Sequence, residues 1–233
     1  MNILAFSAHP DDVEINCGGT MAKYTKQGHQ VTIIHACTGD KGHFEIPPTQ
    51  MAKIRIQESL SAGNIIGAKV LCLGYGDSEL CHTPETLSHF VRAIRECAPD
   101  VIITHTPDDY HMDHVTVSKL VVDASFLVTI PFYQPEIKPL EKVPQLYFME
   151  PYTGFSFCPQ EFVDITDTID DKLAMMKCHD SQLTWLKEHD NIDILEYIKI
   201  SGQYRGFQCG TAYAEGFIRY STALRAVPAR FLP

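Results

Sequence analysis

Short apolar segments alternate with helix-compatible segments through the first 126 residues, and this alternation constrains the fold more than any other feature of the sequence. The expected strands cover residues 3–8, 31–37, 69–73 and 100–105, and the expected helices cover residues 20–28, 49–66, 84–97 and 113–126. Strands separated by helices require right-handed crossover connections, which place parallel strands in one sheet with helices on both of its faces. The sequence therefore predicts an α/β fold with a Rossmann-like, open and mostly parallel sheet.

The second half of the chain is less regular, because four prolines between residues 131 and 144 mark an extended, looping region. The elements expected after it are strands over residues 145–150 and 161–165, a helix that ends at about residue 179 and a helix over residues 192–208. Thr166 and Asp167 are expected to cap the first of these helices. A length of 233 residues is within the range of one α/β domain, so we expect residues 1–233 to form a single domain.

The composition excludes several classes of protein. The 19 Lys and Arg residues and the 29 Asp and Glu residues leave a formal net charge of -10, without a concentrated basic patch. Such a charge repels a phosphate backbone, so we expect no nucleic-acid partner. No apolar run approaches the ~20 residues of a membrane span, and the N-terminus lacks the pattern of a secretory signal. We therefore expect a cytoplasmic protein with no membrane partner.

Polar residues follow the expected strands at the points where the strands end. His9, Asp11 and Asp12 come directly after the first strand, and the segment from His105 to His114 follows the fourth. In an open α/β sheet the ligand site lies beyond the carboxyl ends of the strands. Imidazoles and carboxylates from two such loops can converge on one cation, and a catalytic zinc site uses three ligands of this kind. The sequence predicts a Zn²⁺ site made by His9, Asp12 and His114, and another divalent first-row metal also suits these ligands.

Asp11, His111 and Asp113 are the expected catalytic residues. Asp11 is adjacent to a metal ligand, and its carboxylate is expected to accept a proton from metal-bound water. Asp113 is expected to hydrogen-bond the imidazole of His111 and to favour its protonated form. That cation would stabilise the oxyanion of a tetrahedral intermediate and deliver a proton to a leaving amine. This arrangement predicts the hydrolysis of an amide.

Two segments resemble the motifs of a known enzyme family. The run Ala8-His9-Pro10-Asp11-Asp12-Val13-Glu14 is similar to the signature of the LmbE-like, or PIG-L, deacetylases, and His111-x-Asp113-His114 is similar to their second motif. Further similarity extends over nearly the whole chain, at residues 18–20, 38–40, 55–58, 163–166, 177–182 and 213–217. Within the family, the chain is most similar to the bacillithiol-biosynthesis branch.

The resemblance implies an LmbE-like fold and a zinc-dependent deacetylase in which metal-bound water attacks the amide carbonyl of an N-acetylglucosaminyl compound. It implies that His9, Asp12 and His114 are the metal ligands, that Asp11 is the base and that His111 is the charged histidine. It also places Arg55 near the substrate, where a guanidinium suits sugar hydroxyls or an acidic group. The implied partner is a small N-acetylated amino sugar. Relatives of the bacillithiol branch form hexamers, so a homo-oligomer, and a hexamer in particular, is expected.

The second motif departs from the family pattern, because Met112 stands where relatives have proline. This change loosens the backbone at His111 without removing a ligand.

Tyr110 is a candidate for binding substrate through its hydroxyl, and His105 is a candidate for a hydrogen bond to a metal ligand. The alternative to an enzyme is a non-catalytic Rossmann-like module that binds a sugar or nucleotide.

Overall fold

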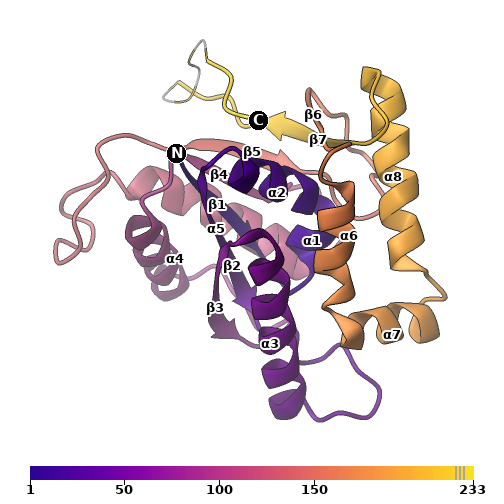
Figure 1. Cartoon of the computed structure of the whole chain (residues 1–233). Helices are drawn as coiled ribbons and strands as arrows, with labels where there is room; N and C mark the ends of the chain where they lie inside the picture. Colours follow the sequence, from indigo (N-terminus) through magenta and orange to yellow (C-terminus); the bar gives the residue numbers. More distant parts are fainter. Residues whose placement is uncertain (224, 226, 228) are drawn as a thin grey trace.

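The centre of the protein is a seven-stranded sheet (Figure 1), seen in a computed structural model that describes residues 1–223, 225, 227 and 229–233. The strands are β1 (Asn2–Ser7), β2 (Gln30–Cys37), β3 (Lys69–Tyr75), β4 (Val101–His105), β5 (Gln145–Met149), β6 (Glu161–Asp164) and β7 (Ala214–Arg219). Their spatial order is β3-β2-β1-β4-β5-β7-β6. Strands β1 to β5 run parallel to one another, and β7 is antiparallel to both β5 and β6. The predicted α/β fold with a mostly parallel sheet is confirmed.

Helices cover both faces of this sheet (Figure 1). They are α1 (Asp12–Asn16), α2 (Gly18–Lys26), α3 (Pro48–Ile66), α4 (Pro84–Cys97), α5 (Met112–Leu127), α6 (Ile169–Lys177), α7 (Asp180–His189) and α8 (Ile194–Cys209). Helices α4 and α5 pack on one face, and α1, α2, α3, α6 and α8 contribute to the core on the other. Within the described part of the chain, none of the helices has the length and apolar character needed to cross a membrane.

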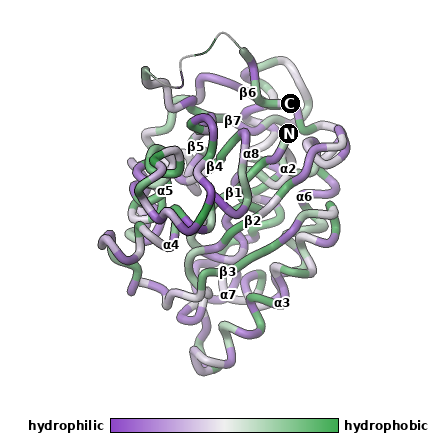
Figure 2. The backbone as a smooth tube through the Cα atoms, turned by 90° about the vertical axis from the view of Figure 1, so that its left-hand side faces the viewer, coloured by the Kyte–Doolittle hydropathy of each residue, from purple (hydrophilic) through white to green (hydrophobic). Residues whose placement is uncertain are grey.

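Alternate residues of the central strands supply the two cores. Leu4 and Phe6 of β1 belong to the core under α4 and α5, while Ile3 and Ala5 belong to the core on the opposite face. The ring of Phe6 stacks on that of Phe90, with centroids 4.6 Å apart. A parallel strand buried on both faces must be apolar along its whole length, which explains the apolar runs of the sequence. Figure 2 shows hydrophobic colour along these central strands.

Three elements were not predicted, and one predicted cap is wrong. The unpredicted elements are α1, α7 and β7. Helix α1 has five residues, too few to show a helical repeat of apolar positions. Helix α6 begins at Ile169 after Thr168, and the backbone N–H of Thr166 donates to the carboxylate of Asp164 (2.9 Å) in a turn before the helix. The local turn hydrogen bond therefore replaces the predicted cap at Thr166 and Asp167.

The sheet order places the loops after β1 and β4 side by side. These strands are parallel neighbours, with Phe6 opposite Thr104, so both chains leave the sheet at the same edge. Strand β2 lies on the other side of β1, and β3 lies beyond β2. The polar segments that follow these strands consequently meet at one edge of the sheet.

Candidate metal centre

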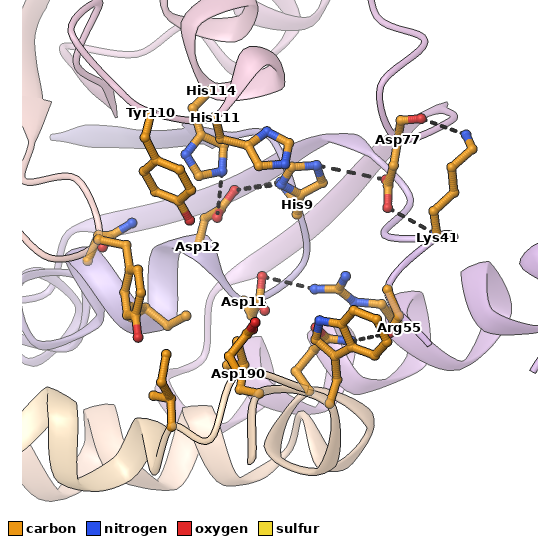
Figure 3. Close-up of a pocket in the computed structure, with 18 of the residues that line it drawn as sticks. His9, Asp11, Asp12, Lys41, Arg55, Asp77, Tyr110, His111, His114 and Asp190 are labelled. Carbon is orange, nitrogen blue, oxygen red and sulfur yellow. Dashed lines mark hydrogen bonds and ion pairs between the residues drawn. The ribbon is translucent and has the colours of Figure 1, made fainter. Parts of the chain in front are cut away.

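The residues predicted to bind a metal lie together at the carboxyl ends of β1 and β4 (Figure 3). His9 follows β1, Asp12 begins α1, and His114 lies in the first turn of α5. Nε2 of His114 is 3.2 Å from Oδ1 of Asp12, and Nδ1 of His9 is 3.7 Å from Oδ2 of Asp12. All three side chains are buried. The structure thus brings one imidazole near each oxygen of a single carboxylate.

Several nitrogen and oxygen atoms here are close enough to share a cation. Sets whose donor atoms lie within 4.8 Å of one another are His9, His111 and His114; Asp12, His105 and His114; and His9, Cys37 and Asp77. His114 belongs to two of these sets, and each predicted ligand belongs to at least one. Imidazole nitrogen and carboxylate oxygen are the ligands of many catalytic zinc sites, and other first-row divalent ions accept them too. The donor chemistry therefore fits a divalent metal ion.

Each imidazole that faces Asp12 has another carboxylate at its second nitrogen. Nε2 of His9 is 3.0 Å from Oδ2 of Asp113, and Nδ1 of His114 is 3.1 Å from Oδ2 of Asp109. Both carboxylate side chains are fully buried. A carboxylate at this position fixes the tautomer and orientation of a histidine, so that the opposite nitrogen faces a metal. The arrangement leaves Nδ1 of His9 and Nε2 of His114 facing Asp12.

The predicted hydrogen bond from the Asp113 carboxylate to His111 is wrong. The two groups are 4.0 Å apart, and Nδ1 of His111 instead accepts a hydrogen bond from the backbone N–H of Asp113 (3.2 Å). The reason is that His111 is the N-cap residue of α5, where the first backbone N–H groups have no partner within the helix. A ring nitrogen that accepts a hydrogen bond carries no proton, so Nε2 is the atom of His111 that holds one. Burial, with His9 and His114 nearby, lowers the pKa of His111.

The charges of this cluster favour a cation. Burial alone would raise the pKa of Asp12, but the adjacent imidazoles of His114 and His105 hold it well below its usual range. Burial lowers the pKa of His114, but the carboxylates of Asp12 and Asp109 outweigh that effect and raise it to about 10. Buried carboxylates therefore stabilise positive charge at this position, as expected at a site for a metal ion.

Asp11 is held by Arg55 beside the cluster. Nη2 of Arg55 is 2.9 Å from Oδ1 of Asp11, and the guanidinium also donates to the carbonyl oxygens of Pro10 and Gly39. Burial raises the pKa of Asp11 to about 6 against the opposing effect of Arg55. Asp11 has a φ of 125°, a backbone conformation that costs a non-glycine residue roughly 1–3 kcal/mol and is concentrated at functional sites. The guanidinium predicted to contact substrate thus contacts the predicted base.

His105 lies in contact with a predicted ligand, as the sequence suggested. Its Nε2 is 3.2 Å from Oδ2 of Asp12 and accepts a hydrogen bond from the backbone N–H of Ala8 (3.0 Å). Burial and the neighbouring His114 lower the pKa of His105 to about 4. The imidazole of His105 therefore lies against Asp12 and is held there by the backbone of Ala8.

A cavity of about 680 Å³ opens over this cluster, within the range of small-molecule sites. Its wall includes His9, Asp11, Asp12, Lys41, Arg55, Tyr110, His111, His114, Tyr152, Trp185 and Asp190. Figure 3 shows Asp190 facing Asp11 and Arg55 from the opposite wall, and Tyr110 beside the histidines. Tyr110 is 68% exposed, so its hydroxyl is accessible to a molecule in the cavity.

Comparison with known proteins places the chain in a family. The family described as PIG-L: GlcNAc-PI de-N-acetylase matches residues 4–125, more than half of the chain. The protein belongs to this PIG-L family. The match begins within β1 and ends within α5, and it therefore includes every residue predicted to act at the site.

Two relatives illustrate the activities found among similar proteins. A diacetylchitobiose deacetylase of Thermococcus kodakarensis is 28% identical over 243 residues, which cover 99% of this chain and 84% of the relative. A 4-oxalmesaconate hydratase of Pseudomonas putida is 26% identical over 185 residues, covering 75% of this chain and 71% of the relative. A solved structure of a conserved protein from Thermus thermophilus has a TM-score of 0.83 and 28% identity, and covers 99% of this chain and 100% of that one.

Sequence reasoning missed several residues of this PIG-L site. Asp109 was not assigned, although its place five residues before His114 in the same polar loop was a signal. Trp185 and Asp190 come from α7 and the loop after it, which were not predicted as part of the cavity. Met112 is 59% exposed at the start of α5, and His111 keeps its place at the helix terminus without the family proline.

Proposed function

We propose that this protein is a metal-dependent hydrolase that removes the acetyl group from the nitrogen of an N-acetylglucosaminyl-type amino sugar. One observation carries the proposal. The carboxylate of Asp11 and a cluster of imidazoles and carboxylates suited to a divalent cation share one cavity, in a chain of the PIG-L de-N-acetylase family. The similarity to a diacetylchitobiose deacetylase supports the class of substrate.

The ligands that we propose for the metal are Nδ1 of His9, the carboxylate of Asp12 and Nε2 of His114, with Zn²⁺ as the ion. A bound divalent ion would supply Lewis-acid chemistry, polarising an amide carbonyl and making water more acidic. Asp113 and Asp109 would hold the two imidazoles in the orientation and tautomer that such binding requires, because each carboxylate lies at the remote ring nitrogen.

Asp11 is the proposed general base. Its Oδ1 is paired with Arg55 at 2.9 Å, which leaves Oδ2 to accept a proton from the attacking water. Arg55 fixes the direction of the carboxylate, since its guanidinium is anchored to two backbone carbonyls as well. We therefore propose that Arg55 positions the base, in addition to lining the substrate cavity.

His111 is the proposed donor to the reacting amide. Its ring lies with its centroid 4.8 Å from those of His9 and His114, and Nε2 is the nitrogen that holds a proton. From there it would donate a hydrogen bond to the carbonyl oxygen as negative charge develops, while the proton that Asp11 accepts from water passes to the departing nitrogen. Water adds to the carbonyl carbon, the C–N bond breaks, and the products are acetate and a free amine. Tyr110, beside His111 at the cavity, is the proposed contact for a substrate hydroxyl.

A second candidate function is hydration of a carbon–carbon double bond, because one relative is a 4-oxalmesaconate hydratase. The same base and metal ligands would serve to activate water. The polyanionic substrate named for that relative would need cationic side chains that are free to bind it. In this cavity Arg55 is paired with Asp11 and Lys41 lies 2.9 Å from Glu79, which favours the deacetylase proposal.

The test is release of acetate from methyl N-acetylglucosaminide, measured for the zinc-loaded protein, the chelated protein and the Asp11→Asn variant. We expect chelation to abolish activity, zinc to restore it, and Asp11→Asn to lower kcat at least about 100-fold, the usual effect of losing a general base. Asp170→Asn, which changes an exposed carboxylate on α6, is the matched control and should retain activity. Full activity after verified metal removal would refute the mechanism, and hydration of 4-oxalmesaconate without acetate release would favour the second candidate.

The location, the partners and the oligomeric state of the protein are further parts of this proposal. We propose a cytoplasmic enzyme that acts on a small N-acetylated amino sugar, without a nucleic-acid or membrane partner. The formal net charge of -10 supports the first exclusion. The expected homo-oligomer, and the hexamer suggested by the family resemblance, would be tested by light scattering of the purified protein.

A further inference from the structure

A second group of side chains suited to a cation lies at Nε2 of His9, whereas the ion of the proposed catalytic centre lies at Nδ1. Nε2 of His9 is 3.9 Å from Oδ1 of Asp77 (Figure 3), and Cys37 completes a set whose donor atoms all lie within 4.8 Å of one another. The three side chains are buried, since His9 and Asp77 are 8% exposed and Cys37 is 0% exposed. The proposed deacetylation uses neither Cys37 nor Asp77.

The sheet brings these three residues together on the side of β1 that is away from β4. His9 follows β1, Cys37 is the last residue of β2, and Asp77 comes two residues after the end of β3. The three strands are parallel neighbours in the order β3-β2-β1, whereas the catalytic centre joins the ends of β1 and β4. The two groups of ligands therefore share His9 and extend to opposite sides of β1.

The carboxylate of Asp77 is held in place by backbone groups. Its Oδ1 accepts a hydrogen bond from the N–H of Gly39 (2.8 Å), and its Oδ2 accepts one from the N–H of Lys41 (3.1 Å). Each oxygen can accept a further contact, because a carboxylate oxygen has two lone pairs. The ammonium group of Lys41 is 2.9 Å from the carboxylate of Glu79, so its charge is paired there. Asp77 therefore presents a fixed oxygen beside His9.

Asp113 adds a second buried carboxylate at the same nitrogen of His9. Its Oδ2 is 3.0 Å from Nε2 of His9, and its Oδ1 is buried without a hydrogen-bond partner in the part of the chain that the structure describes. Two buried carboxylates thus lie near one imidazole nitrogen, and buried negative charge is costly unless a cation compensates it. His9 and Asp77 also line the cavity, which gives an ion a path to this position.

The combination of sulfur, nitrogen and oxygen donors selects the kind of ion. Thiolate and imidazole bind zinc and similar transition-metal ions, whereas Mg²⁺ and Ca²⁺ require oxygen ligands. Ligands about 2.0–2.3 Å from a tetrahedral zinc lie roughly 3.3–3.8 Å from one another, so the 3.9 Å between His9 and Asp77 needs only a small adjustment. We propose that Sγ of Cys37, Oδ1 of Asp77 and Nε2 of His9 form a second site for a zinc-like divalent cation. Oδ1 of Asp113 is its fourth ligand.

An ion at this second site changes the role of His9. The protons of the Cys37 thiol and of Nε2 of His9 pass to solvent when the ion binds, and the hydrogen bond between His9 and Asp113 is lost. Asp113 then no longer orients His9 toward the catalytic ion. The second ion should therefore inhibit deacetylation. This inhibition rests on the proposed function, whereas the binding of the second ion does not.

Titration of the reduced, metal-free protein with Co²⁺ tests the second site without reference to activity. A thiolate bound to Co²⁺ gives an intense charge-transfer absorption in the near ultraviolet, and the proposed catalytic ligands include no sulfur. We expect the native protein to bind two Co²⁺ ions per chain and to show this absorption. Cys37→Ser should bind one ion and lose the absorption. Asp77→Asn should bind the second ion at least about tenfold more weakly than the native protein.

Cys72→Ser is the matched control for this titration. Cys72 lies on the neighbouring strand β3, and its Sγ is 3.5 Å from the carbonyl oxygen of Cys37, but it does not belong to the group of donors. This variant should bind two ions and keep the absorption.

Acetate release from methyl N-acetylglucosaminide tests the effect of the second ion. Zn²⁺ added beyond the first equivalent should lower kcat about tenfold or more in the native enzyme and in Cys72→Ser, the usual effect of losing a carboxylate that orients a metal-binding histidine. Cys37→Ser should keep its activity at the same zinc concentration. Equal inhibition of Cys37→Ser and the native enzyme would overturn the inhibitory role of the second site.

The outcomes separate the second site from the proposed function. A native protein that binds one Co²⁺ ion without the charge-transfer absorption would overturn the second site even if acetate is released, and this result does not depend on the folding of any variant. An absorption that persists in Cys37→Ser would overturn it as well. Conversely, two bound ions with an absorption that depends on Cys37, without acetate release by the zinc-loaded protein, would support the second site and refute deacetylation.

Discussion

Removing the carboxylate of Asp113 tests the reassignment of this residue from His111 to His9. Asp113 is fully buried, and its Oδ2 lies 3.0 Å from Nε2 of His9 and 2.8 Å from the backbone nitrogen of Ser78. Asp113→Ala leaves both N–H groups without this acceptor. Asp113→Asn keeps the shape and one oxygen acceptor but removes the negative charge.

The size of the effect follows from these contacts. Loss of a carboxylate that orients a metal-binding histidine lowers metal affinity about 10- to 100-fold, or roughly 1.4–2.7 kcal/mol. A hydrogen bond to a charged group contributes a similar amount, roughly 1.5–3 kcal/mol. We therefore expect zinc affinity to fall about tenfold in Asp113→Asn and nearly 100-fold in Asp113→Ala. The alanine variant should also lose roughly 1–3 kcal/mol of unfolding free energy, because the N–H of Ser78 is left unpaired.

The assay is competition for Zn²⁺ with a chromophoric chelator, together with urea unfolding of the metal-free proteins. Asp123→Asn is the control, since Asp123 lies on the same helix but forms a surface pair with His82. Zinc affinity of Asp113→Ala within about threefold of the native value would refute the reasoning. An unchanged zinc affinity with a shifted pH–rate profile would restore the original assignment, in which Asp113 acts through His111.

Two further predictions follow from the surroundings of the site. Gly39 has a φ of 72°, and a Cβ there would overlap the guanidinium of Arg55, whereas Gly67 has a φ of 71° and open space around it. Both alanine variants should lose about 1 kcal/mol of unfolding free energy. Only Gly39→Ala should also lower kcat/KM, by about tenfold or more, and equal activities of the two variants would contradict this prediction. Burial lowers the pKa of His35 to about 4, so below about pH 6.5 the unfolded chain binds a proton that the native protein does not. Between about pH 7.5 and pH 5, the native protein should therefore lose about 2 kcal/mol more unfolding free energy than His35→Gln. Urea denaturation at both pH values measures this difference, and equal losses for the two proteins would contradict the prediction.

The elements that were predicted well are those whose sequence pattern depends on their burial. The runs 31–37 and 100–105 are apolar because β2 and β4 lie between two layers of helices, and the structure ends both strands at the predicted residue. The helix predicted over residues 84–97 begins at Pro84, directly after Thr83, whose side chain accepts a hydrogen bond from the backbone N–H of Thr86. Strand β7 was not predicted. It pairs with β5 and β6, which lie about 50 or more residues earlier in the chain, so its place in the sheet depends on tertiary contacts.

The residues of the site were also predicted only in part. His9, Asp12 and His114 were predicted to converge because each follows a strand, and parallel neighbouring strands end at the same edge. Which carboxylate faces which imidazole was not predictable in this way. Asp113 was assigned to His111 by proximity in sequence, but residues one or two apart on a helix point in different directions. The side chain of Asp113 consequently reaches His9 across 104 positions of the chain.

The sequence by itself determined the fold class, the edge of the sheet that carries the site and the kinds of side chain gathered there, because apolar periodicity and the residues after each strand are local properties. Tertiary structure decided the pairing of Asp113 with His9, of Asp109 with His114 and of Arg55 with Asp11. It also decided that Trp185 forms the far wall of the cavity. These contacts depend on the directions of side chains from separate elements, and those directions are fixed only when the helices pack on the sheet.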